Sequence, residues 1–180
     1  MEFEPERYMQ RIAPPPVVLV STLYGETKNV APFGMMMPIS SRPPLLVLGV
    51  SEKRDTFKNI KDTGEFVVGI ATPNLVKQIE IAAERFPREV SEFEKAGLTP
   101  VKSRIVKPFR IKECQSNFEC KLEWMKEAGD HYVVVGRVVA ADIRDDVNRT
   151  GTREDINPVY YVVRHVYAKK GSTITHPQSS

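Results

Sequence analysis

The stretch VLVSTLYGETKNVAPFGMMMPIS, residues 18–40, decides how this chain folds. It begins in a Val-rich run, Val17–Thr22, and ends in a second apolar run, Met35–Ser40, and both patterns are typical of β-strands. The residues between them include glycine, one asparagine and one proline, which favour a turn or loop. We therefore expect two strands joined by a wide loop that is neither a tight hairpin nor an ordinary polar connection.

Outward from this stretch, short β-rich runs dominate the chain. Three prolines, residues 14–16, impose an extended entry to the first strand. A turn at residues 127–130 indicates a hairpin between two of the later runs. The further predicted strands are Leu45–Val50, Glu65–Ile70, Arg104–Ile111, Asn117–Lys126, His131–Ile143 and Val159–Tyr167.

Helical patterns are few and short. One is expected over Asp55–Asp62, with Asp55 as N-cap and Gly64 just past its end. Two more are expected over Asn74–Arg85 and Ser91–Ala96. Many strands with few helices predict a mainly β barrel or sandwich with peripheral helices, rather than a doubly wound parallel sheet.

Composition and charge narrow the classes of function. The 180 residues are 41% hydrophobic and 27% charged, as in a soluble single domain, and the net charge of +3 is scattered. This distribution argues against a nucleic-acid partner, and the apolar runs are too short for a membrane span. The acidic, polar start does not resemble a signal peptide, so we expect a cytoplasmic protein.

Two cysteines, Cys114 and Cys120, are the only thiols. A disulfide between them is possible, but reduced thiols fit a cytosolic protein better. We expect Cys120 to be buried and Cys114 to be more exposed. No histidine lies at ligand spacing from either, so no metal site is predicted.

A candidate phosphate site follows the strand that ends at Val50. Ser51, Lys53 and Arg54 come directly before a predicted helix, and Thr56 lies in its first turn. Free backbone N–H groups at a helix start, together with hydroxyls and cations, suit a phosphate group. The alternative is an ordinary helix start with solvated cations.

The loop within residues 18–40 has the composition of a ring-binding site. Ser21 and Thr22 supply hydroxyls, Asn29 both donates and accepts, and Ala31 and Pro32 form a small, rigid wall. The alternative is a wide turn that serves only the fold. Taken together with the phosphate segment, the loop predicts a mononucleotide-like ligand.

An ordered set of motifs resembles the flavin reductase-like, FMN-binding split-barrel family, flavoredoxin-like members above all. After Thr22 and Gly25 the set contains NVAP (29–32), PIS (38–40), RPPLLVLGVS (42–51), RDTFKNI (54–60), TGEFVVGI (63–70), SEFEKAGLTP (91–100), NFECKLE (117–123), VVVGRVV (133–139) and PVYYVVRHVYAKKG (158–171). The resemblance implies an antiparallel, Greek-key-like split β-barrel that binds FMN as a homodimer, with the flavin near the subunit interface. The barrel domain would span residues 14–170, between an extension (1–13) and a polar tail (171–180).

The resemblance also implies roles for particular residues. Thr22, Asn29, Ala31 and Pro32 would line the isoalloxazine and ribityl groups. The phosphate would be held by Ser51, Lys53 or Arg54, and Thr56, with Asn59 nearby. Further cofactor candidates are Ser21, Phe33, Gly34 and His165.

Two of these further candidates carry alternatives. Many family members have serine at the position of Gly34, which leaves only the glycine backbone for contact here. His165, in the last predicted strand, would reach the flavin of its own or the partner subunit. The alternative for His165 is a structural role. No catalytic acid or base is predicted.

The predicted function is that of an FMN-dependent oxidoreductase. NADH, NADPH or another donor would reduce the flavin, and electrons would pass to free flavin, ferric iron or a redox partner protein. The sequence has no strong nicotinamide signature, so an FMN-binding electron carrier without its own NAD(P)H reductase activity is the main alternative. A barrel that has lost its flavin is a third possibility.

Overall fold

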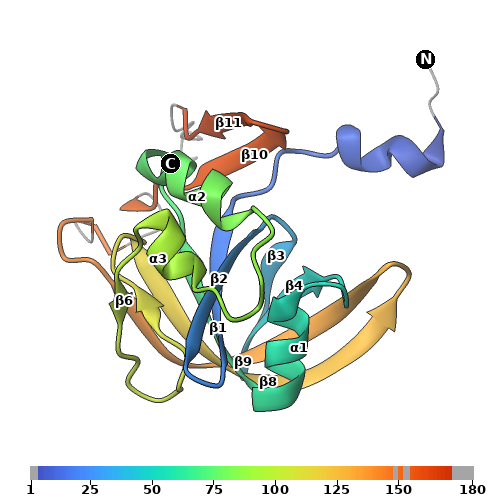
Figure 1. The fold of residues 1–180 in the computed structure, drawn as a ribbon. Coiled ribbons are helices and arrows are strands. Elements are labelled where there is room, and N and C mark those ends of the chain that lie inside the picture. Colours follow the sequence, from blue (N-terminus) through green and yellow to red (C-terminus); the bar gives the residue numbers. More distant parts are fainter. Residues whose placement is uncertain (1–3, 148–149, 152–154, 172–180) are drawn as a thin grey trace.

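The computed structural model describes residues 4–147, 150–151 and 155–171. Its main feature is a seven-stranded antiparallel sheet with the order β2-β1-β5-β8-β9-β4-β3 (Figure 1). The strands are β1 (Val18–Tyr24), β2 (Thr27–Phe33), β3 (Met36–Ser41), β4 (Pro44–Val50), β5 (Glu65–Ile70), β8 (Ser116–Ala128) and β9 (His131–Ile143). The predicted mainly β class is confirmed.

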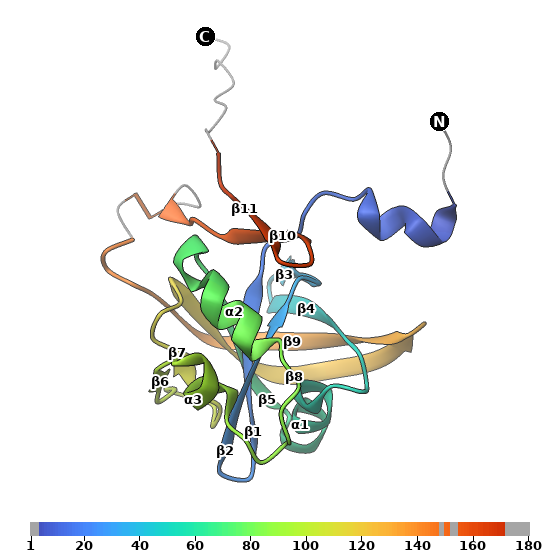
Figure 2. The same ribbon diagram turned by 45° about the horizontal axis from the view of Figure 1, so that its top comes forward.

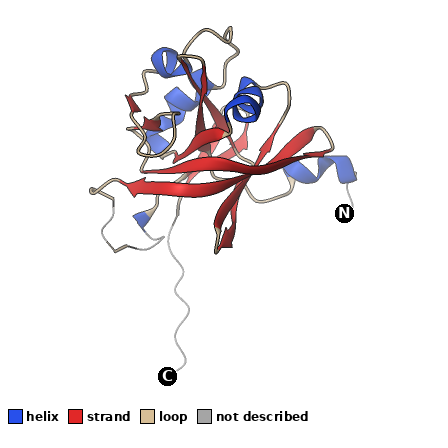
Figure 3. Cartoon of the chain, turned by 90° about the horizontal axis from the view of Figure 1, so that it is seen from below, coloured by secondary structure: helices blue, strands red, loops and turns tan. Residues whose placement is uncertain are grey.

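The sheet curls because its two edge strands follow one another in the chain. β2 and β3 lie at opposite ends of the strand order, yet only Gly34 and Met35 separate them. The sheet must therefore bend round until its edges meet, which gives a barrel that is split between β2 and β3. β8 and β9 are the longest strands, and Figure 3 shows two long strands that cross the whole molecule.

The expected wide loop of residues 23–34 is wrong, because most of it is strand β2. β1 and β2 form a tight hairpin with a two-residue turn, Gly25–Glu26, and Gly25 has the positive φ of +55° that such turns use. Pro32 is tolerated because β2 is an edge strand of the sheet, where a missing N–H breaks no ladder. The hairpin register places Thr22 directly opposite Asn29.

Within the described residues, three α-helices pack against the barrel: α1 (Asp55–Thr63), α2 (Val76–Ala82) and α3 (Glu92–Ala96). Arg54, not Asp55, is the N-cap of α1, and the Asp55 carboxylate instead pairs with Lys58 at 3.2 Å. α2 is shorter than predicted at both ends: a 3₁₀ turn, η2 (Pro73–Leu75), precedes it, and it ends at Ala82 rather than at Arg85. A further 3₁₀ helix that the sequence did not indicate, η1 (Pro5–Gln10), stands away from the barrel (Figure 1).

Alternation along β1 sends side chains into two separate cores. Val18 and Val20 face the barrel interior, where Phe57 and Ile60 of α1 pack against them. Val17 and Leu19 face a second core that is covered by α2 and α3. The core inside the barrel also contains Leu48, Phe66, Val68 and Val134. The second core also contains Leu75, Ile79, Ala82 and Phe93. The two cores hold α1, α2 and α3 against the β1–β2 hairpin.

The predicted strand Arg104–Ile111 is mostly irregular. Only β7 (Arg110–Ile111) is a strand, and it pairs with β6 (Pro100–Val101). The backbone N–H groups of residues 104–106 donate to the carboxylate of Glu119 at 2.7–3.3 Å, so they make no sheet ladder. Hydrogen bonds to the buried Glu119 carboxylate on β8 therefore replace the strand pairing that the apolar pattern of this segment predicted.

The predicted strand Val159–Tyr167 is a hairpin. β10 (Val159–Val163) turns at Arg164–His165 and returns as β11 (Val166–Lys169), with His165 at a φ of +60°. Figure 2 shows this hairpin lying beside α2. Tyr161 and Tyr167, opposite one another in the ladder, stack edge to face with ring centroids 5.9 Å apart.

Both cysteines are free and fully buried, so the expected exposure of Cys114 is wrong. Cys114 packs against Gly69, where any added Cβ would meet its sulfur. Burial raises the pKa of both thiols well above the usual range, which makes them inert packing groups. Among the helices of the described residues, none is long and apolar enough to cross a bilayer.

Candidate functional site

A cavity of about 430 Å³ lies between strand β2, the start of α1 and the segment after α2. It brings together six residues that the sequence singled out in two separate stretches. They are Asn29, Ala31, Ser51, Lys53, Arg54 and Thr56. The segment predicted to hold a ring and the segment predicted to hold a phosphate therefore share one cavity.

One part of this cavity is suited to a phosphate group. α1 begins there, and its first-turn N–H groups and helix dipole favour an anion. Lys53 and Arg54 line the same space, together with Arg85 and His131, to which no pattern in the sequence pointed. This donor set, four nitrogen-bearing side chains beside a helix start, fits the phosphate of a mononucleotide.

The side chain of Asn29 is the centre of a buried polar network beneath the cavity. Its Oδ1 accepts hydrogen bonds from Thr22 Oγ1 at 2.9 Å and from Thr56 Oγ1 at 3.3 Å. Thr22 Oγ1 in turn accepts from Asn59 Nδ2 at 3.0 Å. Thr22 and Asn59 are almost fully buried and do not line the cavity. Their hydrogen bonds hold the side chain of Asn29, which does line it, in place.

Arg88 completes this network from the segment between α2 and α3. Its guanidinium donates to Asn59 Oδ1 at 2.7 Å and lies 3.8 Å from the centroid of the Tyr24 ring. The same group is within 4 Å of the carboxylates of Asp55 and Asp62. Arg88 therefore joins the β1–β2 hairpin to α1. No periodic pattern in the sequence points to Arg88, because it lies in an irregular segment.

Glu92, the first residue of α3, is one of three acidic residues that line the cavity, with Asp55 and Glu84. Its two carboxylate oxygens each lie 3.0 Å from Nδ2 of Asn29, and Oε2 also accepts from the backbone N–H of Val30 at 3.3 Å. The residue is only 8% exposed and lines the cavity. Burial raises the pKa of the Glu92 carboxyl, and the neighbouring charge of Asp55 adds to this effect.

Besides Thr22, four predicted residues lie along or next to the β1–β2 hairpin without lining the cavity. Ser21 is buried, and its hydroxyl has no partner among the described residues. Pro32 and Phe33 are partly buried, and Phe33 packs against the barrel interior. At Gly34, an added Cβ would come within 3.0 Å of the Pro15 ring, so a serine there would press on the proline entry.

His165 lies in the β10–β11 turn and lines none of the cavities described here. Its Nδ1 is 2.7 Å from Oε2 of Glu80 on α2, and the hydroxyl of Tyr167 donates to Oε1 of the same carboxylate at 2.6 Å. These bonds lower the pKa of Glu80, with the Tyr167 hydroxyl the largest cause. Within one chain, the contact between His165 and Glu80 connects the β10–β11 hairpin to α2.

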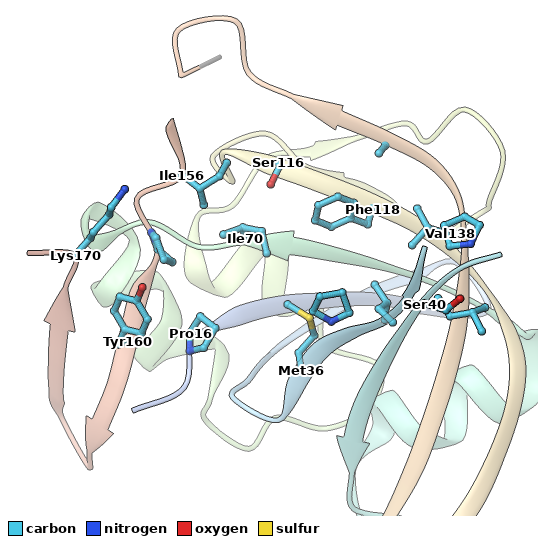
Figure 4. Close-up of a pocket in the computed structure, with 16 residues that line it drawn as sticks. Pro16, Met36, Ser40, Ile70, Ser116, Phe118, Val138, Ile156, Tyr160 and Lys170 are labelled. Atoms are coloured by element: carbon cyan, nitrogen blue, oxygen red, sulfur yellow. The ribbon is translucent and has the colours of Figure 1, made fainter. Parts of the chain in front are cut away.

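A second, larger cavity of about 620 Å³ opens at one end of the barrel (Figure 4). Met36, Ile70 and Phe118, which also pack on the interior core, project into it. The buried hydroxyl of Ser116 in its wall has no partner among the described residues. The wall is otherwise mostly apolar, and within the described part of the chain it shares no residue with the first cavity.

Metal-binding clusters do not accompany either cavity. Among the described residues, no three His, Cys, Asp or Glu side chains are grouped so that they could hold a metal ion.

Comparison with known proteins connects this architecture to a family. The family described as "Flavin reductase like domain" matches residues 9–170. An uncharacterised protein of Aquifex aeolicus is 37% identical over 166 residues, covering 84% of this chain and 85% of its own. A protein of Archaeoglobus fulgidus, also uncharacterised, is 36% identical over 148 residues, covering 82% and 81%.

Solved structures share the fold over nearly the whole chain. Nitrilotriacetate monooxygenase component B from Bacillus cereus superposes with a TM-score of 0.86 at 29% identity, covering 97% of this chain and 95% of its own. Flavoredoxin from Methanosarcina acetivorans gives 0.86 at 20% identity, covering 99% and 95%, which shows the fold alone. A flavin reductase-like protein with a "split barrel domain" from Shewanella frigidimarina gives 0.85 at 19%, covering 99% and 100%, and likewise shows only the fold.

The family match over residues 9–170, the curled sheet and the cavity that joins the two predicted segments are consistent with one another. The chain belongs to the flavin reductase-like family of split-barrel proteins.

Proposed function

We propose that the 430 Å³ cavity binds FMN. The observation that carries this proposal is the hydrogen bond between Thr56 and Asn29, which holds the start of α1 against the middle of β2. Lys53, Arg54 and the first turn of α1 would hold the phosphate, while the β2 backbone near Ala31 would form the wall for the rest of the cofactor. The family match supports a flavin, and the one helix start with Lys53 and Arg54 beside it supports a ligand with one phosphate group.

When bound, the flavin would supply one- and two-electron redox chemistry, and the chain would supply position and electrostatics. We propose that the protein is an FMN-dependent oxidoreductase of the cytoplasm. NADH, NADPH or another donor reduces it, and free flavin, ferric iron or a redox protein accepts the electrons. The two buried free thiols are typical of a reducing compartment. The similarity to nitrilotriacetate monooxygenase component B supports a role in redox chemistry.

The experiment begins with the purified protein and added FMN. Binding should quench flavin fluorescence and saturate at one FMN per chain. Absence of binding would exclude the proposal.

The FMN-loaded protein is then mixed anaerobically with NADH and, separately, with NADPH. Bleaching of the visible flavin band by either nucleotide supports the reductase. No bleaching by either, together with rapid reduction by a low-potential protein donor, would instead support an electron carrier.

We also propose that the protein works as a homodimer. Strand β3 is an edge of the sheet and exposes Met37 at 58% and Ile39 at 43%, and the β10–β11 hairpin exposes Val162 and Val163. Unpaired edge strands with large apolar side chains tend to pair with another chain. A second copy of the chain would cover this surface and close the barrel-end cavity.

A further inference from the structure

The N-terminal arm, residues 4–13, stands away from the barrel in both views of Figures 1 and 2. It contains η1, and its large apolar side chains Tyr8, Met9 and Ile12 are 58%, 52% and 64% exposed. The backbone N–H of Ile12 donates to the carbonyl oxygen of Tyr8 at 3.1 Å, which continues the helical turn past η1. The arm is therefore a structured segment whose apolar side chains are left largely uncovered by its own barrel.

The apolar side chains of the arm share one side of its helical turn. Residues three and four positions apart on a helix are neighbours, and Ile12 follows Met9 by three positions and Tyr8 by four. Arg7 and Arg11, also four positions apart and exposed, form a separate charged row. An amphipathic segment of this kind is stabilised by burying its apolar side against another surface.

The connection between the arm and the barrel is stiff. Pro14, Pro15 and Pro16 have fixed φ angles, and each proline also restricts the residue before it to extended conformations. The carbonyl oxygen of Pro15 accepts a hydrogen bond from the N–H of Tyr161 at 3.0 Å, which fixes the direction in which the chain leaves the barrel. A sharp reversal of the arm onto its own barrel is therefore disfavoured, and its apolar side is available to another chain.

The arm leaves the barrel beside the 620 Å³ cavity, since Pro16 is part of the wall of that cavity (Figure 4). Met36 and Pro38 of β3 line the same cavity, whose wall is mostly apolar. Met37 and Ile39, the exposed side chains of the proposed dimer edge, alternate with them along β3. The start of the arm, the cavity and the proposed dimer edge are therefore continuous with one another.

The exposed edge residues alone are too few for a stable dimer. Specific interfaces bury about 800 Å² on each partner, whereas even a large aromatic side chain buries only about 150–250 Å². Met37, Ile39, Val162 and Val163 are smaller and only about half exposed, so together they supply much less than this area. The apolar side of the arm and the apolar cavity are the additional surfaces that the dimer requires.

The symmetry of a homodimer determines how these two surfaces would meet. A two-fold axis makes each contact occur twice, so an arm that enters the partner's cavity is matched by the partner's arm in the first cavity. We propose that the arms are exchanged in this way, with Tyr8, Met9 and Ile12 of each chain packed in the 620 Å³ cavity of the partner. This inference rests on the proposed homodimer, and it adds the segment that each chain contributes and the cavity that receives it.

The first test is a photo-cross-link from the arm. Tyr8 is replaced by p-benzoylphenylalanine, which keeps an aromatic side chain, and the variant is mixed with a large excess of ¹⁵N-labelled wild-type chain. After exchange of subunits and irradiation, mass spectrometry identifies the joined peptides. The expected product joins the unlabelled arm to a labelled peptide from the cavity wall, within residues 36–46 or 156–160.

The second test measures the dissociation constant of the dimer by sedimentation velocity over a dilution series. Tyr8→Ser combined with Ile12→Ser removes four apolar side chains from each dimer and should raise this constant about hundredfold or more. Arg7→Ser combined with Arg11→Ser is the matched control on the charged row of the same arm. It should remain within about threefold of the wild type, because exposed charges contribute little.

An unchanged dissociation constant in the Tyr8 and Ile12 double variant would overturn the exchange of arms. Cross-links that form only within the unlabelled chain, or that join the arm to a labelled peptide away from the cavity, would overturn it as well. In both cases a dimeric wild-type protein would leave the proposed homodimer in place. A monomeric wild-type protein would instead contradict the homodimer itself, so the two failures are distinguishable.

Discussion

The hydroxyl of Thr56 donates a 3.3 Å hydrogen bond to Oδ1 of Asn29, across 27 positions of sequence. This bond joins the first turn of α1 to the middle of β2, and it is buried. It connects the start of α1, where the proposed phosphate would bind, to the β2 wall of the cavity. The consequences can be tested separately for binding and for stability.

The first prediction concerns the phosphate end. Replacing both Arg54 and Thr56 by Ala should weaken FMN binding far more than it weakens the fold. A charge-assisted contact from Arg54 to phosphate contributes on the order of 1.5–3 kcal/mol, so its loss should weaken binding at least tenfold in the dissociation constant. Loss of the Thr56 hydroxyl adds to this, because it removes the bond that holds the start of α1 against Asn29. Fluorescence titration measures binding, and urea denaturation without FMN measures the fold.

Lys61→Ala is the control for this pair, because Lys61 is an exposed cation on the same helix. It should change neither quantity appreciably. The single variant Thr56→Ser keeps the hydroxyl and should retain most of the affinity. An unchanged dissociation constant in the double Ala variant would show that the phosphate binds elsewhere.

The second prediction concerns the pair Asn29 and Glu92. Asn29→Asp places two carboxylates against one another and removes both donor hydrogens of the amide. We expect a loss of about 3–5 kcal/mol in the free energy of unfolding at neutral pH, as for an uncompensated buried charge.

Adding Glu92→Gln to that variant restores one donor and one acceptor in exchanged positions. The double variant should recover a substantial part of the lost stability, and a double-mutant cycle in urea measures the coupling. Additive effects of the two substitutions would show that the Asn29–Glu92 hydrogen bonds do not contribute to the fold.

Local patterns in the sequence were sufficient for the β-rich class, for most strands and for the clustering of Ser51, Lys53, Arg54 and Thr56 at a helix start. These features depend on residues close together in the chain. The hairpin at Gly25–Glu26 was missed because Asn29 and Pro32 weigh against a strand. Pro32 is compatible with a strand at the edge of a sheet. That β2 is an edge strand depends on the topology of the whole sheet, which a local pattern does not encode.

The supporting residues of the site could not be found in the same way. Glu92 and Arg88 act on Asn29 and Asn59 across 63 and 29 positions. The segment SEFE indicated only a short helix start. Contacts of this kind depend on how α3 packs on the β1–β2 hairpin, which no local pattern in a single sequence encodes.

The third prediction concerns pH and the C-terminal hairpin. The Tyr167 hydroxyl and His165 lower the pKa of Glu80 below its value in an unfolded chain. A carboxyl of this kind contributes stability that is fully present above its unfolded pKa of about 4.3 and is lost as the pH falls through the lower folded pKa. The free energy of unfolding should therefore decline on acidification below about pH 4.3.

Glu80→Gln should flatten this part of the profile, because Gln carries no charge to protonate. Urea denaturation at a series of pH values measures the free energy of unfolding. Glu89→Gln, at an exposed position of the following segment, controls for the loss of one negative charge. A Glu80→Gln profile as steep as that of the wild type would show that the cluster does not stabilise the hairpin.

The fourth prediction concerns assembly through β3. The chain has a mass of 20.4 kDa, so light scattering on the eluted protein should give about twice that value. Replacing Met37 and Ile39 by Glu introduces charges into the exposed apolar edge, where a second copy would have to bury them. The double variant should elute as a monomer, since burying an unpaired charge in an interface costs several kcal/mol.

Ile105→Glu is the control, because Ile105 is 55% exposed but lies in the segment before β7 rather than on β3. It should remain dimeric. If the flavin lies near the subunit interface, the monomeric double variant should also release FMN, although Met37 and Ile39 line neither cavity. A wild-type mass of one chain would contradict the proposed dimer. A double variant that stays dimeric would show that the interface lies on another face of the chain.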